Sequence, residues 1–600
     1  MERKKNRIEA DLCVVGGGIA GVCAAVAAAR LGARVVLLQD RSVLGGNASS
    51  EIRMHIVGAD CHGSRPGARE TGLLEELRLE DAVRNPQRSF PQWDLLLYEM
   101  VVEEPGITLL LNTVCTGCSL EEGGAIGTVE AVRHGTEEAF TISARFFADC
   151  SGDGRLGMEA GADFRMGREA VAEFGETLAL PEADARTLGS SILFSAKEHP
   201  TPQPYLAPSW TRKFTKPEFK RRGIAGGYEY GFWWLEWGGQ FDTIADSDKI
   251  RHELLRIALG IWDYIKNSGE HPDSANWALE WIGSVPGKRE SRRFLGPHVL
   301  TQSDIETGRL FEDRVAYGGW WLDLHPPSGV DAIDEDPCVQ HHIPHLYGIP
   351  LRALHSRNVP NLFFAGRNVS ATHVAFASTR VMGTCAVMGQ AVGTAAALLL
   401  GRRGSIAELS TPETLSAIQQ ALLKEDAYLP GIEADRFGDL ALSARLSASG
   451  WTPGREASNV LNGTARRVEA AWTPGGVASE NVWEASAFPG FLQFDWEAPQ
   501  EIGALHLTFC TGLARELTLS PSDKLTRKMV RGPQPETVRD YDIVADGKTV
   551  LQVRGNYQRK RRHGLRLGGI RSLRIEFLAG QAGVEGPVRV YETRILPPTP

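Results

Sequence analysis

A chain of 600 residues is too long to fold around one hydrophobic core, so we expect two or three domains. Apolar residues make up 42% of the chain and charged residues 23%, as in soluble globular proteins. The formal net charge of -9 argues against nucleic acid as a partner.

The N-terminus and the most apolar segment both bear on location. The first fifteen residues carry charge but no apolar leader segment. The apolar stretch 386–400 contains glycines and follows Arg380, so we interpret it as a buried helix and expect no membrane contact. The nine cysteines are scattered, several within apolar runs, as is typical of buried thiols. We therefore expect a cytoplasmic protein with reduced thiols, and its oligomeric state stays open.

The first forty residues read as a strand, a glycine-rich turn, a helix and a second strand. Gly16, Gly18 and Gly21 form a GxGxxG pattern directly after the first strand. In this pattern the first glycine allows the tight turn, the second lets the backbone approach a diphosphate, and the third lets helix and strand pack closely. The helix begins at Ile19 and Ala20, where free N–H groups would face the phosphates. We predict a dinucleotide-binding βαβ unit.

The second strand ends at the place where an acid usually binds the ribose hydroxyls. Here that place is held by Gln39, followed by Asp40, and which of the two contacts ribose stays open. The next loop, GGNASSE, begins with two glycines that permit close backbone approach to a cofactor. A simple turn is the alternative. The loop residues predicted to bind the cofactor are Gly45, Gly46, Asn47, Ala48 and Ser49.

Three later positions resemble the remaining elements of a flavoprotein. The string DCSGDG ends a strand and resembles the segment that closes over FAD, which implicates Asp149, Gly152 and Asp153. The string FAGRN resembles the strand that meets the ribityl chain, with Gly366 and with Arg367 in the usual acidic place. The helix that follows would direct its N-terminus at the flavin ring. Val114 and Met382 complete the predicted cofactor residues.

The middle of the chain differs from both ends. Segments 1–165 and 345–440 have alternating strand and helix patterns, whereas 166–344 is rich in aromatic residues and reads as an inserted substrate cap. Residues 441–600 contain short strand-like runs between Gly, Pro and Asn turns. The predicted fold is an α/β, Rossmann-like FAD-binding domain with an inserted cap, followed by an all-β jelly-roll sandwich.

Four separated strings then occur in the order typical of one family. VLGGNASSEIR, ADCSGDGRLG, ESRRFLGPHVLTQSDI and NLFFAGRNVSATHVAFASTRVMGTCAVMGQAVGTAAA resemble the bacterial FAD-dependent oxidoreductases often encoded beside polysaccharide-degradation genes. The resemblance covers about residues 8–430 and implies FAD and an oxidoreductase fold, without fixing a substrate. The run FLQFDWEAPQEIGALHLTF resembles galactose-binding, discoidin-like domains, which bind carbohydrate or serve only in packing.

The cysteines and histidines of the sequence do not form the patterns typical of a metal site or an iron–sulfur cluster. Cys115 and Cys118 form a CxxC pair, but no further cysteines stand at cluster spacing, and we interpret the pair as structural. His341, His342 and His345 read as a loop, so we predict no metal ligand.

Histidines and arginines beside the cofactor strings are the catalytic candidates. His373 would take the proton of a substrate hydroxyl, and Arg380 would hold a polar or anionic substrate. The alternative for His373 is a structural hydrogen bond. His55 is the third candidate, with His62 beside it.

Aromatic residues at 228–237 and at 320–321 suggest a sugar-binding surface, although core packing explains the same composition. The predicted function is FAD-dependent oxidation or reduction of a small polar substrate, most plausibly carbohydrate, by hydride transfer to flavin N5. Two alternatives stay open. One is redox-neutral glycoside cleavage through transient sugar oxidation, and the other is a carbohydrate-binding protein with a non-catalytic flavin fold.

Overall fold

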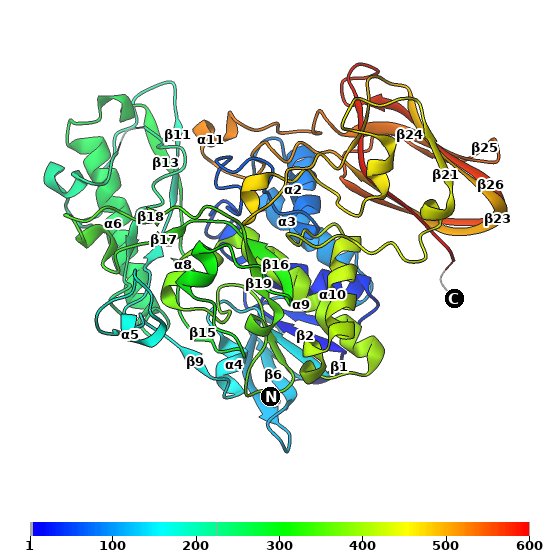
Figure 1. Ribbon diagram of the computed structural model, residues 1–600. Coiled ribbons are helices and arrows are strands. Elements are labelled where there is room, and N and C mark those ends of the chain that lie inside the picture. The colour runs from blue at the N-terminus through cyan, green and yellow to red at the C-terminus, as the bar shows by residue number, and fades with distance from the viewer. Residues whose placement is uncertain (1–3, 225, 599–600) are drawn as a thin grey trace.

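A parallel β-sheet forms the centre of the N-terminal half of the molecule (Figure 1). The computed structural model describes residues 4–224 and 226–598. The sheet has the strand order β20-β8-β2-β3-β4, and each neighbouring pair is parallel. Its strands are β2 (Leu12–Val15), β3 (Val35–Leu38), β4 (Ile107–Leu110), β8 (Phe146–Asp149) and β20 (Leu362–Phe364). All of these strands therefore end at one edge, where ligands bind in sheets of this kind.

Two helices rich in alanine and glycine pack closely against each other beside this sheet. They are α1 (Ile19–Arg30) and α9 (Met382–Arg402). A Cβ atom at Gly389 would lie 2.1 Å from the carbonyl oxygen of Ala20, and one at Gly393 would lie 2.1 Å from that of Ala24. The missing side chains thus let the two backbones touch. By length and composition α9 could span a membrane, but 89% of its most apolar window is buried inside the protein, in agreement with the predicted buried helix.

A second sheet and further helices complete the N-terminal half. This sheet has the order β1-β7-β6-β5 and lies next to the parallel sheet. Its strands are β1 (Lys4–Glu9), β5 (Thr113–Leu120), β6 (Ile126–Arg133) and β7 (Glu138–Ser143). The helices are α2 (Leu73–Arg84), α3 (Phe90–Val102), α4 (Arg155–Glu159), α8 (His373–Thr379) and α10 (Pro412–Lys424).

The cap has a hydrophobic core of its own, built around α6 (Ser247–Asn267). Ile250, Leu254, Ile257, Ile261 and Ile265 recur at helical spacing and are buried. They pack against most of the aromatic cluster. The cap strands are β10 (Ser190–Ser191), β11 (Phe194–Glu198), β12 (Glu236–Trp237), β13 (Trp277–Ile282) and β14 (Gly287–Lys288).

The chain returns from the cap to the N-terminal half earlier than its composition suggests. We predicted a cap from 166 to 344, but apolar residues between 300 and 322 pack into the core of the N-terminal part around the parallel sheet, which we call the sheet domain. These residues leave the cap because β16 (Arg314–Gly318) pairs antiparallel with β19 (Tyr347–Pro350), which follows the cap in the chain. Other elements of this region are α5 (Val171–Phe174), α7 (Gln302–Glu306), β9 (Phe164–Arg165), β15 (Arg293–Phe294), β17 (Leu322–Leu324) and β18 (Val339–His341).

The C-terminal part is an all-β unit with a separate core (Figure 1). Its strands pair antiparallel in the order β22-β27-β23-β26-β24-β25, and β21 also pairs with β23. Two of them, β23 and β26, are long and irregular, so that each half of β23 pairs with a different set of neighbours. The strands are β21 (Arg445–Ala448), β22 (Trp483–Ala485), β23 (Gly490–Phe509), β24 (Val538–Ala545), β25 (Lys548–Val553), β26 (Lys560–Gly580) and β27 (Val588–Leu596).

A buried histidine should make this β unit sensitive to acid. Burial, together with Lys560 and Arg562 nearby, lowers the pKa of His506 from 6.5 to about 3. The folded state thus binds the proton less readily than the unfolded state, and stability falls as the pH drops below about 6.5. Between pH 7 and pH 5 this linkage costs about 2 kcal/mol.

We therefore expect His506→Gln to lose less stability than the wild type over that interval. Urea unfolding at pH 7 and pH 5, followed by tryptophan fluorescence, measures the difference. The exposed His134 gives the matched control, since His134→Gln should follow the wild type. Equal losses in wild type and His506→Gln would contradict the assignment.

Candidate cofactor and substrate site

One large cavity opens at the carboxyl edge of the parallel sheet. Its volume is about 1180 Å³, and residues of the sheet domain, the cap and the C-terminal unit all line it. Such a volume accommodates a dinucleotide together with a small substrate. The predicted residues that line it are Gly16, Gly18, Ile19, Ala20, Gln39, Asp40, Gly45, Gly46, Asn47, His55, Val114, Gly152, Asp153, Gly366, Arg367, Arg380 and Met382.

The three glycines of the first turn have different surroundings. A Cβ atom at Gly21 would lie 1.8 Å from the carbonyl oxygen of Gly16, so helix α1 could not approach the turn with a side chain there. Gly16 has a φ of 105° and lies against the backbone of Cys150. A Cβ atom at Gly18, by contrast, would meet no protein atom within 4 Å. Gly18 thus leaves open space at the start of α1, where a bound diphosphate needs it.

The structure separates the roles of Gln39 and Asp40. The Gln39 side chain accepts a hydrogen bond from the Gly17 N–H at 2.9 Å and donates one to the Val43 carbonyl at 3.0 Å. Both ends of its amide are therefore used to hold the glycine turn. Asp40 is exposed, lines the cavity and has no side-chain hydrogen bond to the described residues. Asp40 is thus the better candidate to bind the ribose hydroxyls.

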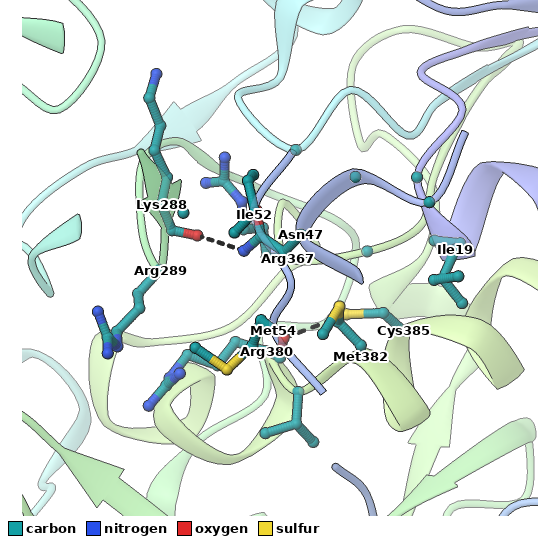
Figure 2. A pocket seen from close by; sticks show the side chains of 18 of the residues that line it. Ile19, Asn47, Ile52, Met54, Lys288, Arg289, Arg367, Arg380, Met382 and Cys385 are labelled. Atoms are coloured by element: carbon teal, nitrogen blue, oxygen red, sulfur yellow. Dashed lines mark hydrogen bonds between the residues drawn. The ribbon is translucent and has the colours of Figure 1, made fainter. Parts of the chain in front are cut away.

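A cluster of charges lies where the cap meets the sheet edge. Asp153 contacts Arg367 and Lys288, with N–O distances of 2.6 Å each. Burial alone would raise the pKa of Asp153, but the two cations outweigh it and hold that pKa below its ordinary value. Asn47 donates to the Lys288 carbonyl at 3.1 Å, as Figure 2 shows, and joins the glycine loop to the cap. Arg367 and Lys288 are placed to neutralise phosphate.

A second polar cluster lies on the cap side of the cavity. His325 is held between two buried carboxylates, with Nδ1 2.8 Å from Glu236 and Nε2 3.0 Å from Asp323. The Arg380 guanidinium donates to Asp323 at 2.9 Å and lies 3.1 Å from His325 Nε2. Burial alone would raise the pKa of Glu236, but Arg289 and His325 lower it by more. The pKa therefore lies below its ordinary value, and the group stays ionised. A histidine oriented by a carboxylate is a common arrangement for proton transfer.

The sheet domain contributes two histidines to the cavity, His55 and His62. Their rings are 5.4 Å apart, and both line the cavity. Burial, with His62 beside it, lowers the pKa of His55 from 6.5 to about 4, so its imidazole is neutral at pH 7. No hydrogen bond joins the His55 side chain to the described residues. His55 can therefore accept a hydrogen bond from a ligand.

The family assignment rests on a comparison that covers most of the chain. The model of the family described as FAD dependent oxidoreductase matches residues 11–422, which include the glycine turn, the cap and helix α9. The chain belongs to the FAD-dependent oxidoreductase family. Its cofactor is FAD, and the prediction of a flavin-dependent enzyme is confirmed.

The residues of this oxidoreductase fit FAD. The open space at Gly18, the free carboxylate of Asp40 and the paired Arg367 and Lys288 would hold the sugar and phosphate parts. The start of α9 at Met382 faces the same cavity and would bring the positive end of a long helix to the flavin ring. Figure 2 shows Met382 and Cys385 on this helix next to Arg380.

Solved structures resemble the oxidoreductase only distantly. A geranylgeranyl bacteriochlorophyll reductase-like protein from Thermoplasma acidophilum has 12% identity, covers 70% of this chain and 85% of its own, and has a TM-score of 0.32. The family 32 carbohydrate-binding module of Streptococcus pneumoniae EndoD has 14% identity, with coverage of 26% and 99% and a TM-score of 0.19. The corresponding module of C. perfringens NanJ, in complex with galactose, has 12% identity, coverage of 26% and 94%, and a TM-score of 0.17. No curated protein sequence matches.

Four residues predicted to bind the cofactor do not line the cavity of the enzyme. Gly21 serves the packing of α1, and Ala48 is buried in the core. The Ser49 hydroxyl donates to the Gly46 carbonyl and shapes the loop. Asp149 is fully buried and accepts hydrogen bonds from the N–H groups of Ser151 and Gly157, at 3.0 and 2.9 Å. These residues fix the segments whose neighbouring residues line the cavity, and do not line it themselves.

His373 is also placed differently from the prediction. The imidazole Nδ1 lies 2.9 Å from Glu290, and the backbone N–H of His373 donates to the Glu169 carboxylate at 2.8 Å. Arg293 joins the same two carboxylates, and all these side chains are buried. His373 is absent from the cavity lining, so it could not reach a substrate there. Its geometry fits the alternative prediction, a structural hydrogen bond, and does not fit a catalytic base.

Only part of the aromatic cluster faces the cavity of the enzyme. Tyr228, Phe232, Trp234 and Trp237 belong to the cap core. The aromatic residues that line the cavity are Tyr230, Trp233, Trp320 and Trp321. The histidines at 341, 342 and 345 were predicted to lie in a loop, but His341 ends strand β18, because it pairs with Leu322 of β17. His342 follows this strand and lies parallel to Trp321, with ring centroids 4.5 Å apart.

Three residues of the polar cluster carry atoms of the kinds that bind metal ions, and this grouping was not predicted from the sequence. Donor atoms of Asp323, His325 and Cys338 lie within 4.8 Å of one another. Arg380, however, already contacts both Asp323 and His325 and compensates the negative charge of Asp323. The absence of a metal stays a prediction. The sequence signal for this cluster was the short string WWLDLHP at 320–326, in which an acid and a histidine alternate.

Proposed function

We propose that this FAD-dependent oxidoreductase oxidises a hydroxyl group of a small polyhydroxylated substrate of the sugar class. The observation that carries the proposal is a cluster in the cavity that the cofactor-binding residues also line: it consists of His325, Asp323 and Arg380, with the buried Glu236 behind His325. The tryptophans beside it, at 233, 320 and 321, offer apolar faces that stack on pyranose rings.

The protein's own groups can remove the hydroxyl proton. In the tautomer whose Nδ1–H donates to Glu236, Nε2 carries the lone pair, and it would accept the hydroxyl proton when the substrate oxygen displaces its contact with Asp323. Arg380 lies 3.1 Å from Nε2 and would bind the substrate oxygen as its O–H bond breaks. The protonated imidazole that results is stabilised by the two carboxylates. When bound, FAD supplies the acceptor for the hydride of the adjacent C–H bond.

Anaerobic mixing with sugars tests the proposal. The purified enzyme, loaded with FAD, is mixed with a panel of monosaccharides and their glycosides while absorption near 450 nm is followed. Lasting bleaching by at least one sugar is expected. Glycoside cleavage without net bleaching would favour the redox-neutral alternative. No bleaching and no product, in a protein whose flavin dithionite still reduces, would overturn the proposal.

A further inference from the structure

A long segment of the C-terminal unit leaves its own domain and reaches the cavity. We define the arm as residues 510–537, which connect β23 and β24 and contain the short helix α11 (Asp523–Thr526). In Figure 1 the orange segment with α11 extends from the β unit across the molecule to the cap. The arm thus connects the three parts of the chain that line the cavity.

Buried contacts hold the arm against the sheet domain. Thr518 Oγ1 donates to the Ile56 carbonyl at 3.1 Å, beside His55. Arg531 contacts the buried carboxylate of Asp81 at 2.7 Å. Arg69 donates to the carbonyl oxygen of Arg515. Because these groups are buried or partly buried, the arm has a fixed position on the sheet domain.

One acid of the arm reaches the histidines of the cavity. Glu516 is buried, and its carboxylate lies 3.5 Å from Nδ1 of His62. His62 in turn contacts Trp320 edge to face, with ring centroids 5.4 Å apart. The C-terminal unit therefore holds a side chain that lines the cavity, through the contact of Glu516 with His62.

The tip of the arm forms a wall of the cavity next to the cap. Ser522, Lys524, Leu525 and Lys528 line the cavity. The N–H of Asp523 donates to Glu229 of the cap at 3.2 Å, and the Asp523 carboxylate contacts Arg88 of the sheet domain at 2.7 Å. These contacts fix α11 between the two domains.

The charge of the cavity is opposite to that of the protein. Nine lysine and arginine residues but only three carboxylates are among the described residues that line it, whereas the whole chain has a formal charge of -9. Arg367 and Lys288 are placed for the FAD diphosphate, and Arg380 for the reacting group. Lys524 and Lys528 have no ion pair or side-chain hydrogen bond to the described residues. Two unpaired ammonium groups at one wall favour an anionic ligand.

We propose that the arm completes the catalytic cavity and that Lys524 and Lys528 bind an anionic substituent of the substrate, so that acidic sugars are preferred over neutral ones. This inference rests on the proposed function, because it assigns the charge of the same substrate. The C-terminal unit then acts as a part of the active site, and carbohydrate binding elsewhere on its surface is not required.

Matched sugar pairs test the inference on the full-length holoenzyme. Anaerobic flavin reduction is measured with glucose against glucuronate and with galactose against galacturonate, in the wild type and in Lys524→Ala/Lys528→Ala. We expect the uronates to reduce the flavin faster in the wild type. The double variant should lose about 10- to 100-fold in the second-order rate constant of flavin reduction by the uronates, since charge-assisted hydrogen bonds are lost, and should keep its rate with the neutral sugars.

Arg527→Ala is the matched control, because Arg527 is exposed in the same turn but does not line the cavity. It should behave as the wild type. FAD content should be equal in all three proteins. Loss of FAD from the double variant would reassign the lysines to the cofactor and overturn the inference. Equal use of neutral and acidic sugars would overturn it while the proposed function stands. Failure of every sugar, with a flavin that dithionite reduces, would refute the proposed function itself and the inference with it.

Discussion

Replacing His325 by alanine is expected to slow flavin reduction by the substrate about 100- to 10,000-fold, the usual contribution of a positioned general base. The variant removes Nε2 as proton acceptor and leaves Glu236 and Asp323 without their shared partner. Stopped-flow absorption near 450 nm measures the rate. FAD content should not change, because no predicted phosphate or ribose contact involves His325.

Two further variants separate a base from a structural residue. Glu236→Gln keeps the shape of the side chain but removes its charge, so it should shift the pH at which the rate rises as well as the rate itself. His341→Ala, in β18 and outside the cavity lining, should behave as the wild type. If His325→Ala keeps the rate and pH profile of the wild type while His55→Ala loses most of the rate, the general base is His55 and the assignment of His325 is wrong.

Replacing Gly18 by alanine is expected to weaken FAD binding at least about 10-fold without unfolding the protein. A methyl group at this position meets no protein atom within 4 Å, so the fold has room for it. It would occupy the space that the diphosphate needs at the start of α1. Fluorescence titration of the apoprotein with FAD gives the affinity, and circular dichroism reports on folding.

The neighbouring Gly21 provides the contrast. A methyl group there would lie 1.8 Å from the Gly16 carbonyl, so Gly21→Ala should lose the fold of the first turn and stability together with FAD. The account of the turn fails if Gly18→Ala binds FAD as the wild type does. It also fails if Gly21→Ala is as stable as Gly18→Ala.

Local patterns were enough to predict the cofactor half of the site. The glycine turn, the loop at 45–47 and the strand ends at 152–153 and 366–367 belong to short strings whose backbone geometry follows from the residues themselves. Gly16 and Gly18 of the turn line the cavity, as do the loop and the two later positions, whereas Gly21 packs inside. Gln39 shows the limit, because only the structure reveals that its amide is used within the protein.

The substrate half depended on contacts between distant segments. His373 does not face the cavity because Glu290, 83 residues away in the sequence, binds its imidazole. His325 acquires its role from Glu236, 89 residues away in β12. Lys524 and Lys528 come from another domain and carry no motif. Such partners follow from tertiary packing, which spacing along the chain does not encode.

The most direct test of the account is a single anaerobic turnover with stoichiometric FAD enzyme and an acidic sugar, analysed by mass spectrometry. One product per bleached flavin is expected, about 2 Da lighter than the sugar, because one hydroxyl loses its proton and the carbon that bears it loses a hydride. A recovered sugar of unchanged mass, or a cleaved glycoside without a reduced flavin, would contradict it.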